Sequence, residues 1–446
     1  MKKTIRIGSG AGYGGDRLEP ALTLLEKGNL DYIGFEGLAE RTIALAQKSK
    51  QKDPSSGYNP LLAYRMEKAL PLAYQNKVKV ITNMGAANPL AALHMISEMA
   101  TRMHLKGLKI AAILGDDIFY QIENYLDFPI LETGHPLSTL SGKLLSANAY
   151  LGIPPILKAL EISADIIITG RVADPALFLA PMVYEFGWKS DDYEKLGKGT
   201  LVGHLLECAG QVSGGYFADP GKKDIPSLWE LGFPYAEVNE SGDGFISKVE
   251  GTGGVINTAT CTEQMIYEIH DPAQYVTPDC VADFSRVQFN EIDKDKVAFI
   301  DAGGTPATDT FKVSVGYHNG YFGEGQMSYG GANCYERALL ACDIVKKRLE
   351  LQQVKAEDLQ LDIIGVNALF PSKELQNTPN EVRIRVSGRT KEKSDAQKIA
   401  NEVETLYTNG PAGGGGATKQ VEEVISVVSI LVPKSDIQTD VIYQEI

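Results

Sequence analysis

The chain has 446 residues, 43% of them apolar, which is enough for large cores in two or three domains. Its formal net charge of -14 excludes a nucleic-acid-binding surface, since no long Lys/Arg run opposes the negative field. No apolar run is long enough for a membrane span, and no secretory signal is visible. The five cysteines form no CxxC pair, which is typical of reduced thiols. We therefore expect a cytoplasmic protein that binds neither nucleic acid nor membrane.

The first half of the chain alternates short apolar runs with helical patterns. Strands are expected over residues 4–8, 31–35, 78–83, 109–114 and 164–169, and helices over 38–48, 61–74 and 89–104. Strands that alternate with helices of this length are typical of βαβ units and a parallel sheet. The pattern predicts an α/β fold in which residues 1–210 form a Rossmann-like domain with a doubly wound parallel sheet.

The second half has short β-like runs interrupted by two helices, which are expected over residues 334–351 and 395–407. Asn333 and Ser394 are the expected N-caps of these helices. The pattern predicts an α+β domain over residues 211–446, which we expect to cover the ends of the parallel strands.

A glycine-rich stretch follows the first expected strand and precedes a helix whose first turn is expected to hold Pro20. Gly10, Gly12 and Gly15 match the G-x-G-x-x-G pattern of dinucleotide-binding folds. Glu36 follows Gly15 by 21 residues, where such folds place the acid that binds the ribose.

Three interpretations of this stretch remain open. It could bind the pyrophosphate of NAD or FAD, bind another anion such as an acyl-carrier phosphate, or form a tight structural loop. The carboxylate of Asp16 would repel a phosphate unless Arg17 or a metal offset its charge. The candidate phosphate-binding residues are Gly10, Gly12, Gly14 and Gly15.

The polar residues that follow the expected strands form the main candidate site. Ligands of open parallel sheets bind outside the carboxyl ends of the strands, although Gly, Asn and Asp are also ordinary turn residues there. Asn83 and Asn148 are candidates for orienting a substrate carbonyl. The candidate catalytic residues, for acid–base work or for holding an anion, are Glu36, Asp116, Arg171 and Asp174.

Two of these positions have more than one interpretation. Asp116 and Asp117 could bind Mg²⁺, or Asp117 could cap the helix that follows it. Arg171 could hold the carboxylate or phosphate of a ligand, or it could pair with Asp174.

Several familiar sites are not predicted. The sequence has no HxxxH or HExxH pair, no GxSxG elbow and no Walker A motif. Cys334 begins an expected helix, where a thiolate would be stabilised, but no histidine pairs with it in the sequence. A late glycine loop over residues 410–416 offers further backbone donors, and Gly413 and Gly414 are candidate binding residues there.

Three stretches resemble the acyclic terpene utilisation (AtuA) family. They are IRIGSGAGYGGDRLEPALTLLEKGNLDYIGFEGLAERTIALAQ, SANAYLG…ADIIITGRVADPAL and NGPAGGGGA…SILVP, in the same order along nearly the whole chain. The resemblance implies a part in the catabolism of citronellol- and geraniol-like compounds, near acyl-CoA carboxylases, hydratases and dehydrogenases. It assigns no reaction to the chain and no role to any single residue.

Longer members of that family carry a further ferredoxin-like domain after the GPAGGGG region. The present sequence ends soon after that loop. The resemblance therefore implies that a separate small protein with a ferredoxin-like domain could be a partner. We also expect a homo-oligomer.

These observations leave three functional hypotheses. The first is an enzyme that acts on a branched acyl-CoA or a related small carboxylate, with the CoA thioester as substrate. The second is a non-catalytic or partner-dependent subunit of an acyl-CoA enzyme system. The third is a nicotinamide-dependent oxidoreductase using NAD, which the opening glycines favour but no hydride-transfer constellation supports.

Overall fold

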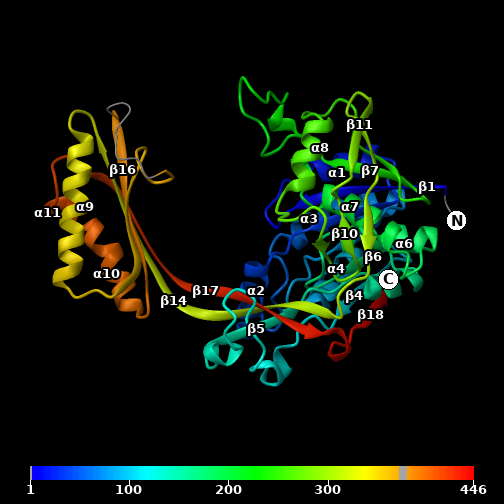
Figure 1. Ribbon diagram of the computed structural model, residues 1–446, viewed down its shortest axis with the longest axis horizontal. Coiled ribbons are helices and arrows are strands. Elements are labelled where there is room, and N and C mark those ends of the chain that lie inside the picture. Colours follow the sequence, from blue (N-terminus) through cyan, green and yellow to red (C-terminus); the bar gives the residue numbers. More distant parts are fainter. Residues whose placement is uncertain (1–2, 371–378) are drawn as a thin grey trace. The chain divides into compact units, whose positions relative to one another are not determined.

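The computed structural model describes residues 3–370 and 379–446. The chain divides into two compact units, of which the first comprises the residues up to Ser141, Leu145–Gly316 and Val427–Ile446. The second comprises Gly142–Leu144 and Tyr317–Ser426. The chain passes from one unit to the other within strands β14 (Thr310–Gly330) and β17 (Gly415–Pro433) (Figure 1). The boundary that we expected near residue 210 lies inside the first unit.

A mixed ten-stranded sheet forms the centre of the first unit. Its strand order is β11-β12-β8-β7-β1-β2-β3-β6-β4-β18. The parallel strands are β1 (Thr4–Gly12), β2 (Tyr32–Glu36), β3 (Lys79–Thr82), β6 (Ile166–Ile168) and β4 (Lys109–Leu114). The antiparallel ones are β7 (Pro234–Asn239), β8 (Gly244–Lys248), β11 (Gln288–Asp293), β12 (Lys296–Ile300) and β18 (Asp440–Glu445).

The strand order corrects one part of the predicted fold class. The predicted mixed α/β fold with parallel strands is confirmed, but a Rossmann-like arrangement is not. In a Rossmann sheet the first strand lies between two parallel neighbours, the second and fourth strands. Here Gly8 of β1 pairs with Ile33 of parallel β2 on one side and with Tyr235 of antiparallel β7 on the other. Residues after 210 thus extend the first sheet, which is why no domain boundary lies there.

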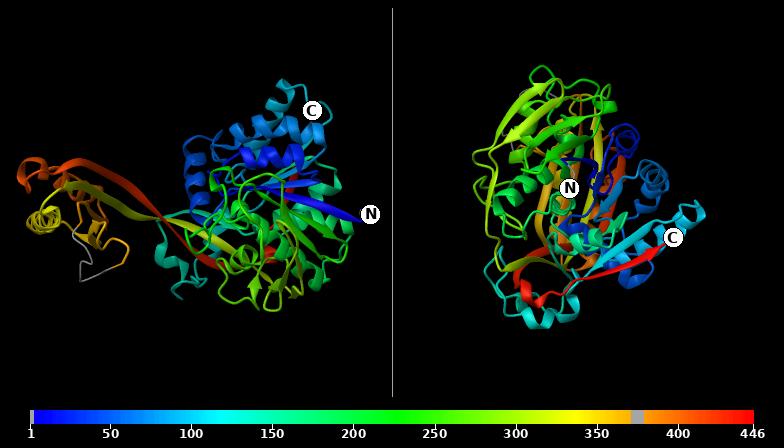
Figure 2. Two further views of the ribbon diagram at one scale, coloured as in Figure 1. Left: turned by 90° about the horizontal axis from the view of Figure 1, so that it is seen from above. Right: turned by 90° about the vertical axis from the view of Figure 1, so that its right-hand side faces the viewer.

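Helices cover both faces of the parallel strands (Figure 2). On one face α1, α3 and α4 bury a core that includes Ile33 and Phe35 of β2. On the other face α6 and α7 pack against β1 and β2. The bounds of these helices and of the others in this unit are α1 (Glu19–Lys27), α2 (Glu40–Lys52), α3 (Leu62–Asn76), α4 (Pro89–Arg102), α5 (Pro154–Glu161), α6 (Ala176–Phe186), α7 (Tyr193–Glu207) and α8 (Thr258–Ile266).

Side-chain alternation along β2 decides which residues face α6 and α7. Ile33 and Phe35 belong to the core on the α1 face, so Tyr32, Gly34 and Glu36 point to the opposite face. A Cβ on Gly34 would lie 2.5 Å from Cε1 of Phe178 in α6, which shows how closely that helix approaches. Because successive side chains of a strand alternate between its two faces, Glu36 at the end of β2 points toward α6 and α7.

The first glycines of the predicted loop belong to a strand. We expected β1 to end at residue 8, but Ala11 pairs with Phe35 and Gly12 with Glu36. A Cβ on Gly10 would lie 2.6 Å from Cε1 of Phe35, so the absence of a side chain permits this close approach. Pro20 lies in the first turn of α1, as predicted.

The second unit has a different architecture. Its main elements follow the order β14, α9 (Cys334–Leu351), β15 (Ala356–Ile364), β16 (Glu381–Thr390), α10 (Lys393–Glu404) and β17. This β-α-β-β-α-β succession, with the sheet order β15-β16-β14-β17, is that of a ferredoxin-like unit. Both long helices pack on this sheet. A unit of this type therefore lies within the chain itself.

The predicted helix caps of the second unit are only partly correct. The helix expected over 334–351 has these same bounds, and Asn333 occupies its N-cap position, although its side chain makes no capping hydrogen bond. Ser394 is not the N-cap, because α10 begins at Lys393, two residues earlier than expected, with Glu392 at the cap. The expected helix over 395–407 is divided into α10 and α11 (Leu406–Asn409).

The remaining short strands are β5 (Leu144–Ala149), β9 (Tyr275–Val276), β10 (Val281–Asp283) and β13 (Gly303–Thr305). The last three form a small antiparallel sheet, against which α7 packs. Among the helices that the structure describes, none combines the length and the apolar character that crossing a bilayer requires.

Replacing Gly34 by Ala tests the close approach of α6 to β2. The new methyl group would overlap the ring of Phe178, so we expect the free energy of unfolding to fall by about 1–3 kcal/mol. Urea denaturation followed by tryptophan fluorescence measures this, because both tryptophans, Trp188 and Trp229, belong to the first unit. The matched control is Gly303→Ala, where an added Cβ would meet only Arg286, at 3.8 Å. Equal stability of the two variants would contradict the prediction.

Candidate functional site

A pocket of about 1180 Å³ lies in the first unit. It is formed by the end of β1 with the turn that follows, the end of β2, the end of α7 and several segments from the region after residue 210. These segments belong to the unit that contains the sheet, and they form part of the pocket over the strand ends. Six carboxylic acids line the pocket: Asp16, Glu36, Glu40, Asp174, Glu207 and Glu268.

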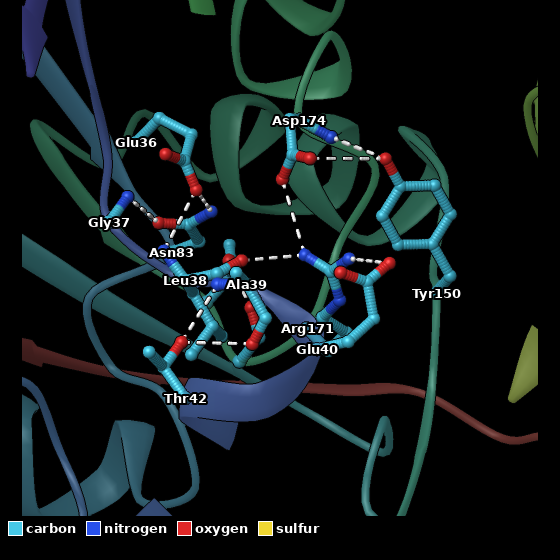
Figure 3. A network of polar contacts seen from close by, with 12 residues as sticks. Glu36, Gly37, Leu38, Ala39, Glu40, Thr42, Asn83, Tyr150, Arg171 and Asp174 are labelled. Atoms are coloured by element: carbon cyan, nitrogen blue, oxygen red, sulfur yellow. Dashed lines mark hydrogen bonds and ion pairs between the residues drawn. The ribbon is translucent and has the colours of Figure 1, made fainter. Parts of the chain in front are cut away.

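Arg171 is the buried cation of this region, with only 2% of its surface exposed. Its Nη1 donates to the carbonyl oxygen of Leu38 at 2.6 Å and to Oδ1 of Asp174 at 3.3 Å (Figure 3). Its Nη2 lies 3.0 Å from Oε1 of Glu40. The guanidinium also lies over the ring of Tyr150, 4.5 Å from its centroid. These contacts join the loop after β2 to the loop after β6. The pairing of Arg171 with Asp174, one of the two interpretations of Arg171, is present, and a ligand-binding role for Arg171 stays a prediction.

Glu36 is held at the end of β2 by backbone and amide donors. Its Oε1 accepts from the Leu38 N–H at 2.8 Å and from Nδ2 of Asn83 at 3.1 Å. Asn83 in turn accepts from the Gly37 N–H at 2.7 Å. Burial raises the pKa of Glu36 to about 7, against the opposing effects of these hydrogen bonds and of Arg171. Both protonation states are therefore populated near neutral pH, so the side chain can donate or accept a proton.

Asp174 and Tyr150 form the other side of the network (Figure 3). The Tyr150 hydroxyl donates to Oδ2 of Asp174 at 3.3 Å and accepts from the Asp174 N–H at 3.1 Å. Burial raises the pKa of Asp174 well above its ordinary range, although Arg171 opposes this shift. Asp174 and Glu36 both line the pocket.

The sequence analysis missed two residues that also line the pocket, His204 and Glu207. They lie three residues apart on α7, and Nδ1 of His204 is 2.7 Å from Oε1 of Glu207. Burial raises the pKa of Glu207, while His204 opposes this shift. A search for His-x-x-Glu at helical spacing could have found the pair, because such residues share one face of a helix.

Asp116 and Asn148 lie together, but outside the residues that line the pocket. Asp116 accepts from Nδ2 of Asn148 and from the Arg171 N–H, both at 2.9 Å. Burial raises the pKa of Asp116 to about 6. Asp116 therefore contacts the backbone of the loop after β6, which carries Arg171, and Asn148 holds Asp116 in place.

The alternative interpretations of Asp117 can be compared directly. Its Oδ1 accepts from the Phe119 N–H at 3.2 Å, at the start of the short helix Phe119–Tyr125. Its Oδ2 accepts from Nε2 of Gln47 at 2.8 Å. Asp117 therefore contacts the start of this helix, although Ile118 rather than Asp117 occupies its N-cap position. Within residues 3–370 and 379–446, no group of three or more His, Cys, Asp or Glu side chains is arranged to hold a metal ion.

The predicted phosphate-binding glycines are divided between different environments. Gly12 and Gly14 line the pocket, whereas Gly10 is covered by Phe35. The Gly12 N–H donates to Oδ2 of Asp16 at 2.9 Å, so this backbone donor already has an anionic partner. Gly15 follows in the turn before α1, outside the lining residues.

The late glycine loop belongs to the second unit. A Cβ on Gly414 would lie 2.6 Å from Sδ of Met327, so this glycine packs closely on the sheet of that unit. Gly413 has a φ of 72°, which favours glycine, and the loop carbonyl of Ala412 accepts from Nη1 of Arg337 at 2.6 Å. A ligand role for Gly413 and Gly414 stays a prediction.

Comparison with known proteins gave one match. Residues 5–443 match the family described as acyclic terpene utilisation family protein AtuA. No curated protein and no solved structure is similar enough to match the chain.

Replacing Glu36 by Gln tests the raised pKa of this carboxyl. Because the pKa in the folded state is about 7 and the ordinary value is 4.5, the folded state binds more protons between these pH values. The free energy of unfolding should therefore fall as pH rises from 4.5 to 7, and Glu36 contributes on the order of 3 kcal/mol of that fall. Urea denaturation at several pH values should show that E36Q lacks this part of the slope.

The exposed acid Glu194 of α7 provides the control for this measurement. E194Q should follow the wild-type pH dependence. A slope for E36Q equal to that of the wild type would show that Glu36 titrates normally in the folded protein.

Replacing Arg171 by Ala tests the buried ion cluster. The change would leave Asp174 buried without its cation, so we expect a loss of about 3–5 kcal/mol in the free energy of unfolding. The double variant R171A/D174N should lose less, because it removes the uncompensated carboxyl. K222A, which breaks the exposed pair with Asp219, should lose less than about 1 kcal/mol. An R171A loss as small as that of K222A would contradict the prediction.

Proposed function

Because the chain belongs to the acyclic terpene utilisation family AtuA, we propose that it is an enzyme of that catabolism. In this proposal the pocket binds a branched acyl-CoA or a related small carboxylate, and Glu36 transfers a proton to or from it. The observation that carries the proposal is a carboxyl with a pKa of about 7 that lines a pocket of about 1180 Å³.

The walls of the pocket support an apolar, branched substrate. Apolar side chains from several segments line it: Leu131, Leu228, Leu231, Phe233 and Leu431. The pocket also has two cationic side chains, Arg17 and Lys312, which could receive the anionic end of such a substrate. Arg171 has a positioning role in this proposal, since its guanidinium holds Leu38, Glu40 and Asp174.

Two features of the site favour this proposal over a nicotinamide-dependent oxidoreductase. Glu36, the expected ribose-binding acid, is bonded to Leu38 and Asn83. The Gly12 N–H, an expected phosphate donor, is bonded to Asp16. The proposal also needs no separate protein to supply a ferredoxin-like unit, since residues 317–426 contain this succession of elements.

Thermal unfolding with candidate ligands tests the substrate class. The ligands are CoA, citronelloyl-CoA, citronellic acid, NAD(H) and NADP(H). A ligand in hundredfold excess over its Kd stabilises the fold by about 2.7 kcal/mol, which raises Tm measurably. We expect a rise with the branched thioester or its acid. A rise only with a nicotinamide nucleotide would contradict the proposal and favour the oxidoreductase. No rise with any of these ligands would favour the partner-dependent subunit.

Hydrogen exchange on the ligand tests the chemistry. We expect wild-type protein to incorporate deuterium from D₂O into citronelloyl-CoA, measured by mass spectrometry. E36Q keeps an acceptor oxygen for Leu38 and Asn83 but cannot transfer the proton, so its exchange rate should fall by about 10²–10⁴-fold. E194Q is the control and should exchange at the wild-type rate. Equal rates for E36Q and the wild type would exclude Glu36 as the proton-transfer group.

A further inference from the structure

His204 is fixed in one orientation inside the first unit. It is 2% exposed, and its ring packs against those of Tyr275 and Phe284, with centroid distances of 5.2 Å and 6.0 Å. Its backbone carbonyl accepts from Nε2 of Gln264 at 3.0 Å. The packing of the ring and the hydrogen bond to the backbone therefore hold His204 in place.

The two ring nitrogens of His204 have different partners. Nε2 lies 3.1 Å from the carbonyl oxygen of Met265, and a carbonyl oxygen only accepts, so Nε2 carries a hydrogen. Nδ1 lies 2.7 Å from Oε1 of Glu207. A hydrogen must occupy this second bond as well. It belongs either to a neutral Glu207 that donates to Nδ1, or to an imidazolium that donates to a carboxylate. The pair therefore shares one proton.

The second carboxyl oxygen of Glu207 has no internal partner. Glu207 is 8% exposed, and its Oε2 is buried without a hydrogen-bond partner among residues 3–370 and 379–446. Glu207 also lines the pocket. A buried carboxyl oxygen without a partner is costly, and a ligand that supplies a hydrogen would remove that cost.

From this geometry we infer that Glu207 is a second proton-transfer residue. His204 holds it as a carboxylate, and Oε2 removes a proton from the ligand. The inference rests on the proposed function and deepens it. In the base form, His204 is an imidazolium and Glu207 a carboxylate. Oε2 takes the proton from a C–H or O–H bond of the ligand, and the electron pair of that bond remains on the ligand. Oε1 continues to accept from Nδ1–H throughout, so the charge of the pair rises by one.

Glu36 completes a pair of opposite roles. Both carboxyls line the pocket, and the negative charge of Glu207 contributes to the raised pKa of Glu36. While the Glu207 carboxylate removes one proton, the neutral form of Glu36 can donate another. A carboxylate base and a neutral acid in one pocket suit a reaction that removes a proton beside a carbonyl and adds a proton at a second position. Isomerisation of a branched acyl substrate and elimination of water from it are reactions of this kind.

Nitrogen NMR of the histidine rings tests the shared proton without any ligand. The full-length chain is labelled with ¹⁵N-histidine, and the His204 signals are identified by their loss in H204Q. We expect wild-type Nε2 to be protonated and Nδ1 to be protonated or strongly hydrogen-bonded. In E207Q, the side-chain amide introduced by the substitution can donate to Nδ1, so Nδ1 should become a bare acceptor. A wild-type ring with an unprotonated Nε2 would overturn the inference.

Deuterium exchange into citronelloyl-CoA tests the transfer to the ligand. E207Q should exchange at least a hundredfold more slowly than the wild type, with E194Q as the matched control on α7. Since E207Q could unfold, H204Q is measured beside it, and thermal unfolding verifies both folds. H204Q should also slow exchange, because it leaves the carboxylate without its imidazolium.

The possible outcomes separate this inference from the proposed function. Loss of exchange in E36Q together with normal exchange in folded E207Q would overturn the inference and leave the proposed function intact. Loss in E207Q and normal exchange in E36Q would support the inference and remove Glu36 from the mechanism. A wild-type protein that exchanges no hydrogen would overturn both.

Discussion

The buried guanidinium of Arg171 is the interaction on which the pocket depends. It lies among the carboxyls of Glu36, Glu40 and Asp174, and it joins the loops that follow β2 and β6. Desolvating a guanidinium and several carboxyls is costly, so the cluster is stable only while each partner is present. The same desolvation keeps protons on some of the acids at neutral pH. The structural requirement and the capacity for proton transfer thus have one physical cause.

The sheet order determines which segments surround that cluster. Because β1 borders antiparallel β7, the residues after 210 return to the first sheet and form part of the pocket over the strand ends. α7 ends beside β1, since a Cβ on Gly12 would lie 2.5 Å from the carbonyl carbon of Cys208. This approach brings the His204–Glu207 pair to the pocket. A dinucleotide fold would instead leave the crevice at this edge open for a nucleotide.

The acid-rich lining of the pocket bears on the kind of ligand that fits. Six carboxylic acids line the pocket, and burial raises the pKa of Glu36 and Asp174, so part of this negative charge is neutralised by protons. An apolar chain is compatible with such neutral acids, whereas a multiply charged group would meet Asp16 beside the glycine turn. Arg17 and Lys312 also line the pocket and could receive the anionic part of a ligand, although Lys312 lies 3.4 Å from Oε1 of Glu40.

The sequence by itself determined the parallel strands, most helices and the candidate acids at the strand ends. Apolar runs such as 109–114 have the observed bounds, because buried parallel strands are apolar on both faces. Glu36 and Asp174 were found because parallel strands all end at one edge of a sheet. Only the tertiary structure decided the rest. Strand order, the return of residues 234–300 to the first sheet and the meeting of His204 with the pocket depend on contacts between residues far apart in the chain. Local periodicity carries no information about such contacts, and the burial that raises the pKa of the acids exists only once they have formed.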